Sequence, residues 1–236
     1  MNSPAAQDLV LLGVVHTDPE LPARLGRALA ALRPGVISVE VSPYALAFRS
    51  RRGPELLARL EANLGPAARQ AGLTPAEAGR RAAVNQLVAY LLPPQEWVVS
   101  RRVAAQTGAL LCPLDLSAWS RRHLAGVDDL LAVDNLALLL SGPPPESAAA
   151  LRRRAAYVLT AQQAGLSPAP HPLPSAPDPE REAVLARRLT RLAREAQHRG
   201  LGRVVHVGGW EHLAAGLEPP TLADRLNLPW PARRLL

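Results

Sequence analysis

The sequence predicts an α/β fold with a mostly parallel central sheet of about four or more strands and large helical inserts. Four short apolar segments bounded by turn formers are expected to be strands, at residues 9–15, 36–41, 109–114 and 203–207. They are almost continuously apolar, as strands buried on both faces are. Helical patterns separate them, which is typical of a parallel sheet with crossover helices.

Helix-start signals lie directly after the first strand and before the last one. The first crossover helix is expected at 19–32, with Asp18 as its N-cap and a proline in its first turn. Together with its flanking strands it forms a predicted βαβ unit over 9–41. The helix Pro179–His198 follows Asp178 as its cap and leads into the last strand.

A single α/β domain is expected over 1–236, with helical inserts at about 43–108 and 117–165. Prolines concentrate at 167–178 and predict an irregular loop there. The chain from Pro219 onward is expected to form a packed or partner-binding tail.

Inside the first insert, proline and glycine punctuate the helical pattern. Thr74 and Glu77 have the spacing of a capping box and predict a helix over 74–92. Gly-Pro or Pro-Pro pairs predict helix breaks at 53–54, 65–66 and 93–94.

Charge and cysteine content limit the class of protein. Lys and Arg number 27 against 20 Asp and Glu, which gives a formal charge of +7. No apolar stretch approaches the roughly 18–20 residues that span a bilayer, and no secretion signal is recognisable. The single cysteine, Cys112, excludes an internal disulfide and a Cys-x-x-Cys pair. We therefore expect a cytoplasmic protein without a membrane segment, which can form a homo-oligomer.

Missing residues and motifs exclude several functions. The chain has no lysine, which a phosphate-binding P-loop, a protein kinase and a pyridoxal phosphate enzyme all need. It also lacks the Gly-x-Ser-x-Gly elbow of the α/β-hydrolases. Dinucleotide binding is not expected, because the turn after Gly13 lacks two of the three fingerprint glycines. Nucleic acid is not expected as a partner, because the arginines are scattered and aromatics are only 3%.

Rare polar residues follow the predicted strands at the point where each strand ends. These are His16, Glu40, Asp115 and His212, one after each strand in turn. In an open parallel sheet, ligands bind at the carboxyl ends of the strands. Two imidazoles and two carboxylates that converge there suit a divalent metal or acid/base catalysis.

Structural roles compete with this interpretation. A single histidine at a strand end is more often a hydrogen-bonded residue than a ligand, and Asp115 can cap the following helix. Glu40 fits a structural role less well, because an unpaired buried carboxylate is costly. His206, inside the last strand, is expected to be a core histidine, and Cys112 a small core hydrophobe.

Three segments together resemble one family. Gly13 to His16 resembles the first Gly-x-x-His motif of the TraB family, which includes pheromone-shutdown proteins and the Tiki metalloproteases. Gly209 to His212 looks like the second such motif, and Glu40 resembles the strand-ending glutamate of the family. Erythromycin-esterase-like and ChaN haem-binding proteins belong to the same wider superfamily.

The arginines of this chain depart from the family pattern. An arginine commonly follows the family glutamate by a few residues, whereas here the nearest one is Arg49. The Asp-Arg pair after the middle strand is replaced by Asp115-Leu116. Arg49, or Arg51 or Arg52 beside it, is expected to substitute.

The resemblance implies a divalent-metal-dependent hydrolase that acts on a peptide or ester bond of a peptide or small-molecule substrate. His16, Glu40 and His212 would bind Mn, Co or Zn and leave one position open for water. Asp115 or Glu211 would take a proton from that water, and Arg49 would face the developing oxyanion.

Two other functions remain open at this point. The same histidines suit a protein that binds haem or a small peptide without catalysis. An interaction protein with a vestigial site would instead dock through its arginine-rich helices or its tail. In the hydrolase, the loop at 167–178 is expected to border the site as a lid.

Overall fold

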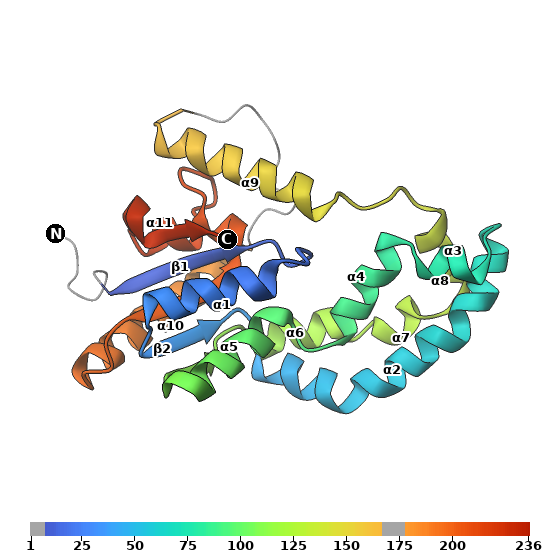
Figure 1. The fold of residues 1–236 in the computed structure, drawn as a ribbon, viewed down its shortest axis with the longest axis horizontal. Coiled ribbons are helices and arrows are strands. Elements are labelled where there is room, and N and C mark those ends of the chain that lie inside the picture. Colours follow the sequence, from blue (N-terminus) through green and yellow to red (C-terminus); the bar gives the residue numbers. More distant parts are fainter. Residues whose placement is uncertain (1–7, 167–177) are drawn as a thin grey trace. The chain divides into compact units, whose positions relative to one another are not determined.

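The computed structural model describes residues 8–166 and 178–236. Within them it confirms the α/β fold class, with five strands in one all-parallel sheet and helices between them (Figure 1). The loop expected as a lid lies outside the described residues, apart from Asp178. No helix in the two described ranges is both long and apolar enough to cross a lipid bilayer.

The described chain divides into two compact units. The sheet unit comprises 8–40, 95–115, 147–166 and 178–236, and it holds all five strands. The helical unit comprises Val41–Pro94 and Leu116–Glu146. The helical unit is therefore smaller than the two expected inserts, whose last helices belong to the sheet unit.

All four predicted strands are present, and burial on both faces is confirmed for three of them, whereas β3 (Leu110–Pro113) is not buried because it lies at the edge of the sheet. The central strands are fully buried, as their continuous apolar runs predict, whereas the two edge strands are partly exposed. The strands are β1 (Leu9–Val14), β2 (Val36–Val39), β3 (Leu110–Pro113), β4 (Val204–Gly209) and β5 (Arg233–Leu235), in the sheet order β3-β2-β4-β1-β5.

Two features of the sheet were not expected from the sequence. β4 lies between β1 and β2, so the flanking strands of the predicted βαβ unit are not neighbours. In the tail, β5 pairs with β1, from Leu11↔Arg233 to Gly13↔Leu235. This edge strand has only three residues, two of them arginines, and therefore gives no apolar signal.

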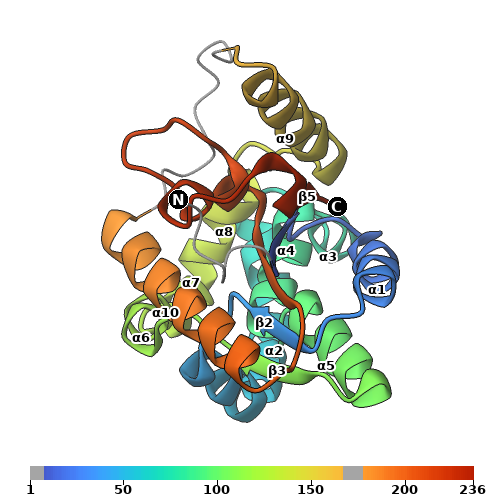
Figure 2. The same ribbon diagram turned by 90° about the vertical axis from the view of Figure 1, so that its left-hand side faces the viewer.

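Helices cover both faces of the sheet. Figure 2 shows α1 (Leu21–Leu32) and α5 (Gln95–Thr107) on one side of it and α10 (Pro179–His198) on the other. The remaining helical elements of the sheet unit are α9 (Ala148–Gln163), η2 (Trp210–Leu213), α11 (Leu222–Arg225) and η3 (Trp230–Ala232).

The caps predicted for α1 and α10 have different outcomes. Asp178 caps α10 as expected, because its side chain accepts a hydrogen bond from the Arg181 N–H at 2.8 Å. Asp18 is not the N-cap of α1; that position is Glu20, whose N–H donates to the Asp18 side chain at 3.0 Å. The helix therefore begins at Leu21, because Asp18 to Glu20 form a turn stabilised by this side chain.

The helical unit corrects three predicted features of the first insert. Its longest helix runs through Pro54 and Pro66, so the breaks expected at these prolines are wrong. Leu56 and Leu60 of this helix are buried in the core of the unit, and such packing outweighs the local cost of a proline. The helices are α2 (Pro43–Gln70), α3 (Pro75–Gly79), α4 (Ala82–Leu91), α6 (Ser117–Leu124), α7 (Val127–Leu130) and α8 (Val133–Ser141).

The helix expected at 74–92 is two helices. The capping box of Thr74 and Glu77 is confirmed. However, α3 ends at Gly79 and α4 starts at Ala82, because glycine disfavours a continuous helix and Arg81 is extended. The break at Pro93-Pro94 is confirmed, since α4 ends just before it.

Candidate functional site

The four polar residues that follow the strands all lie at the carboxyl ends of the sheet. His16 comes just after β1, Glu40 directly after β2, Asp115 after β3 and His212 in η2 after β4. All four belong to the sheet unit. Arg49 belongs to the helical unit, where its Nε donates to the Tyr90 carbonyl at 2.8 Å.

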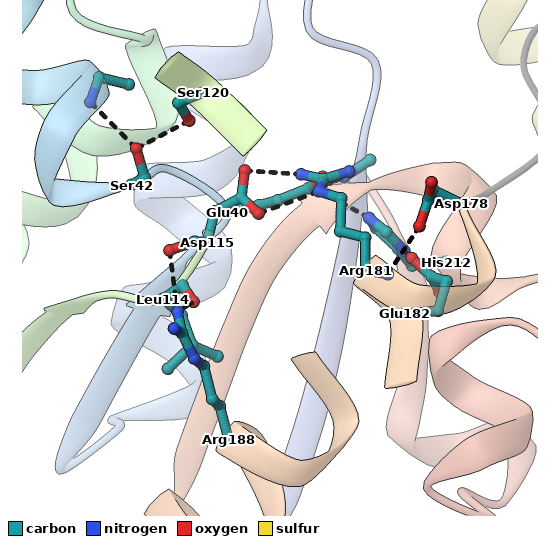
Figure 3. A network of polar contacts seen from close by, with 12 residues as sticks. Glu40, Ser42, Leu114, Asp115, Ser120, Asp178, Arg181, Glu182, Arg188 and His212 are labelled. Carbon is teal, nitrogen blue, oxygen red and sulfur yellow. Dashed lines mark hydrogen bonds and ion pairs between the residues drawn. The ribbon is translucent and has the colours of Figure 1, made fainter. Parts of the chain in front are cut away.

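Glu40 is the centre of a buried polar network (Figure 3). One oxygen, Oε2, accepts the Gly209 N–H at 2.7 Å and lies 2.9 Å from His212 Nε2. The other, Oε1, accepts from Arg181 Nη2 at 2.5 Å. Burial alone would raise the pKa of Glu40, but the positive charges of His212 and Arg181 hold this pKa well below its usual range.

Arg181 is the arginine that sequence reasoning missed. It comes from the first turn of α10 and joins the ends of β2 and β3, because its Nε and Nη2 donate to the two oxygens of Asp115 at 2.9 and 2.8 Å. Arg188, two turns later, donates to the Leu114 and Asp115 carbonyls at 2.8 and 2.9 Å. The arginine that contacts Glu40 therefore comes from α10, 141 residues later in the sequence, and not from the residues that directly follow Glu40.

His212 is buried between two carboxylates. Its Nε2 lies 2.9 Å from Glu40, and its Nδ1 lies 2.9 Å from Glu182 Oε1. Desolvation would lower the pKa of His212, but the two carboxylates raise it to about 10. His212 is therefore an imidazolium at neutral pH. Charges then alternate along Asp115, Arg181, Glu40, His212 and Glu182, which together we call the ion chain.

His16 has a different environment. Its side chain is 58% exposed, and its Nδ1 lies 2.5 Å from Glu96 Oε1, a carboxylate that is only 5% exposed. Desolvation acts to lower the pKa of His16, but the Glu96 carboxylate, with smaller effects of Glu40 and Glu211, raises it to about 9. The other ring nitrogen, Nε2, has no hydrogen-bond partner within 8–166 and 178–236.

Glu96 and Glu182 were not predicted, although the sequence carries a signal for both. Each occupies the buried stripe of its helix, where the other positions are small or apolar. On α10 the stripe runs from Glu182 through Leu185, Ala186 and Leu189. A carboxylate at such a position needs a partner in the core. Searching the core-facing helix positions for acidic residues would have found both.

Two glycines make room for these side chains. A Cβ on Gly208 would lie 2.6 Å from Glu40 Oε2, and one on Gly209 would lie 2.7 Å from Glu211 Oε2 and 3.4 Å from His16 Nε2. Glu211 and His16 therefore approach the same point above the end of β4. Burial raises the pKa of Glu211, so this carboxyl group holds a proton more readily than an exposed glutamate.

His206 is a core histidine, as the sequence predicts. It is fully buried in β4, and its Nδ1 lies 3.0 Å from Ser38 Oγ in the paired strand β2. Burial lowers its pKa to about 3, so the ring is neutral.

The predicted metal ligands do not fit a metal ion in this arrangement. Both oxygens of Glu40 and both ring nitrogens of His212 already have protein partners. The Arg181 guanidinium beside Glu40 would also repel a cation. Among the described residues, no group of three or more His, Cys, Asp or Glu side chains is placed to hold a metal. An ion would bind only if Arg181 and Glu182 moved away from their partners.

The arrangement supports acid/base chemistry. An exposed imidazole and a partly buried carboxyl group, His16 and Glu211, share one space, and the ion chain fixes the ends of β2, β3 and β4 behind them.

Comparison with known proteins does not add to this, since no protein-family model, curated protein or solved structure matches the chain.

Proposed function

We propose that the sheet unit is an acyl hydrolase that cleaves a peptide or ester bond and that His16 is its proton-transferring group. The observation that carries this proposal is the exposed side chain of His16, whose Nε2 approaches the same point beside Gly209 as Glu211 does, at the carboxyl ends of the central strands. Pockets of open α/β sheets lie at this edge. The resemblance to TraB-type hydrolases supports the same reaction class.

The proposed reaction uses water as the nucleophile. Neutral His16 accepts a proton from water through Nε2 while the water oxygen attacks the carbonyl carbon. When the tetrahedral intermediate breaks its bond to the leaving group, the imidazolium returns the proton to the departing amine or alcohol. Glu211 is placed to hold or relay a proton at the same point, because its pKa is raised.

Arg181 takes the part that the sequence assigned to Arg49. Its Nε and Nη2 are fixed by Asp115 and Glu40, whereas Nη1 contacts no acceptor in the described parts of the chain. A guanidinium held in this way has a donor ready for the negative charge that develops on the carbonyl oxygen. We propose that Nη1 stabilises this oxyanion.

The test is hydrolysis of p-nitrophenyl esters and peptide p-nitroanilides by the full chain. Replacing a general acid/base typically costs about 10²–10⁴-fold in rate, so His16→Gln should lose at least about 100-fold in kcat/KM. His198→Gln is the matched control, because His198 is exposed at the end of α10. Equal activity of wild type and His16→Gln, or turnover of no substrate by the wild type, would refute the proposal.

A chelator separates this mechanism from the metal-dependent one. We expect hydrolysis to survive dialysis against a chelator, because the atoms of Glu40 and His212 are held by protein partners. Activity that is lost on chelation and restored by Mn, Co or Zn would support the metal-dependent hydrolase that the family resemblance implies.

A further inference from the structure

The ring of His16 is exposed, yet its position is fixed both by the backbone turn that carries it and by a contact at one ring nitrogen. A β-turn follows β1 directly, in which the Asp18 N–H donates to the Val15 carbonyl at 2.9 Å, and His16 lies inside this turn. Asp18 is itself buried and accepts from Arg152 Nη1 of α9 at 2.9 Å. The backbone of His16 is thus fixed, and only its side-chain torsions are left free by the turn.

Glu96 fixes those torsions. It is the partner of His16 Nδ1, at 2.5 Å, and it lies on the buried stripe of α5 together with Val99, Ser100 and Val103. An ionised carboxylate only accepts hydrogen bonds, so His16 Nδ1 must be the donor. The neutral ring then carries its proton on Nδ1 and its lone pair on Nε2, which has no hydrogen-bond partner among residues 8–166 and 178–236.

We propose that Glu96 is a positioning residue that orients the His16 ring and selects the tautomer with a free Nε2 lone pair. This inference rests on the proposed function, because it explains why the exposed imidazole can accept a proton from water through Nε2. A buried carboxylate behind a catalytic imidazole has this effect in Ser-His-Asp enzymes, where the amide variant keeps the geometry but stabilises the wrong tautomer. Glu96 acts through His16 and does not touch the substrate.

The experiment compares Glu96→Gln with Glu195→Gln, an exposed glutamate of α10. Glutamine has the shape of glutamate, but its amide can donate to Nδ1 and thereby move the ring proton to Nε2. With p-nitrophenyl acetate as the probe, we expect kcat of Glu96→Gln to fall at least about 100-fold with KM changed by less than about threefold. Glu195→Gln should keep both constants.

A second measurement does not depend on turnover. ¹⁵N NMR of the histidine rings, at a pH where His16 is neutral, should show the proton on Nδ1 in the wild type and on Nε2 in Glu96→Gln. Glu96→Asp keeps the charge and replaces Glu96→Gln if the latter unfolds; the shorter side chain should then give mixed tautomers and an intermediate kcat. An unchanged tautomer in a folded Glu96 variant would overturn the inference, and so would a changed tautomer with unchanged kcat.

The two proposals can fail separately. If the wild type hydrolyses no substrate but Glu96→Gln changes the His16 tautomer, the hydrolase proposal fails and the positioning role of Glu96 remains. If hydrolysis depends on His16 but not on Glu96, the hydrolase proposal remains and the positioning role of Glu96 fails.

Discussion

Arg181 holds the ion chain together, and its removal gives the sharpest test of that network. The chain contains three carboxylates, of Asp115, Glu40 and Glu182, and two cations, of Arg181 and His212. Arg181→Met keeps most of the aliphatic stem but leaves His212 as the only positive charge. Glu40 and Asp115, each less than 10% exposed, then lose their contacts with the guanidinium. Removing one partner of a buried ion pair typically costs about 3–5 kcal/mol.

The expected loss is large enough to measure by thermal and urea unfolding. For a chain of this length, 1 kcal/mol corresponds to about 2–4 °C in Tm, so Arg181→Met should lower Tm by about 6–20 °C at pH 7. Arg191→Met, on the exposed face of the same helix, is the control and should change the free energy of unfolding by less than about 0.5 kcal/mol.

Acid should reduce the difference in the free energy of unfolding between wild type and Arg181→Met. The pKa of Glu40 is lowered in the folded wild type, so its contribution to stability is present above about 4.5 and is lost as the pH falls below that value. Arg181→Met should therefore destabilise the chain less at pH 4 than at pH 7. A loss below about 1 kcal/mol at pH 7, or one that does not change with pH, would refute the buried ion chain.

Three further predictions follow from the site. Gly208→Ala places a methyl group 2.6 Å from Glu40 Oε2 and should lower the free energy of unfolding by about 1–3 kcal/mol in thermal and urea unfolding. Gly26→Ala is the control, because nothing lies within 4 Å of the added methyl group, and it should raise the free energy of unfolding by about 0.5–1 kcal/mol. Because the pKa of His16 is raised to about 9, kcat/KM should increase with pH up to about 9, and a plateau already reached near pH 7 would contradict this. Because the pKa of His212 is raised to about 10, its ion pairs stabilise the fold fully below about pH 6.5 and progressively less up to about pH 10. Urea titrations should therefore show that His212→Gln lowers the free energy of unfolding less at pH 10 than at pH 6.

The sequence predicts the strands and the ends where His16, Glu40, Asp115 and His212 lie, because a buried parallel strand has a strong local signature. Continuous apolar runs and the turn formers after them are enough to find these positions. The tail strand β5 was not found, since a three-residue edge strand with two arginines carries no such pattern. Pro54 was expected to break a helix, because the tertiary packing that holds α2 together cannot be read from the local sequence.

The partners of those four residues could not be predicted, because they depend on tertiary contacts between distant segments. Glu96 lies 80 residues after His16, and Arg181 lies 141 residues after Glu40. Arg49 is the nearest arginine after Glu40 in sequence, whereas the structure supplies an arginine from α10. The position of β4 between β1 and β2 decides which side chains meet, and the sequence does not give strand order.

The environments of the two histidines show why residue type alone did not separate their roles. Both follow a Gly-x-x motif at the end of a central strand, and the sequence therefore predicts two equivalent ligands. In the structure, His212 is buried with a carboxylate at each nitrogen, which leaves no lone pair and fixes its positive charge. The His16 side chain is exposed, with one carboxylate at Nδ1 and no hydrogen-bond partner at Nε2 among the described residues. One histidine thus maintains the site while the other is able to exchange protons, and the difference comes from Glu182 and Glu96, the two buried helix carboxylates.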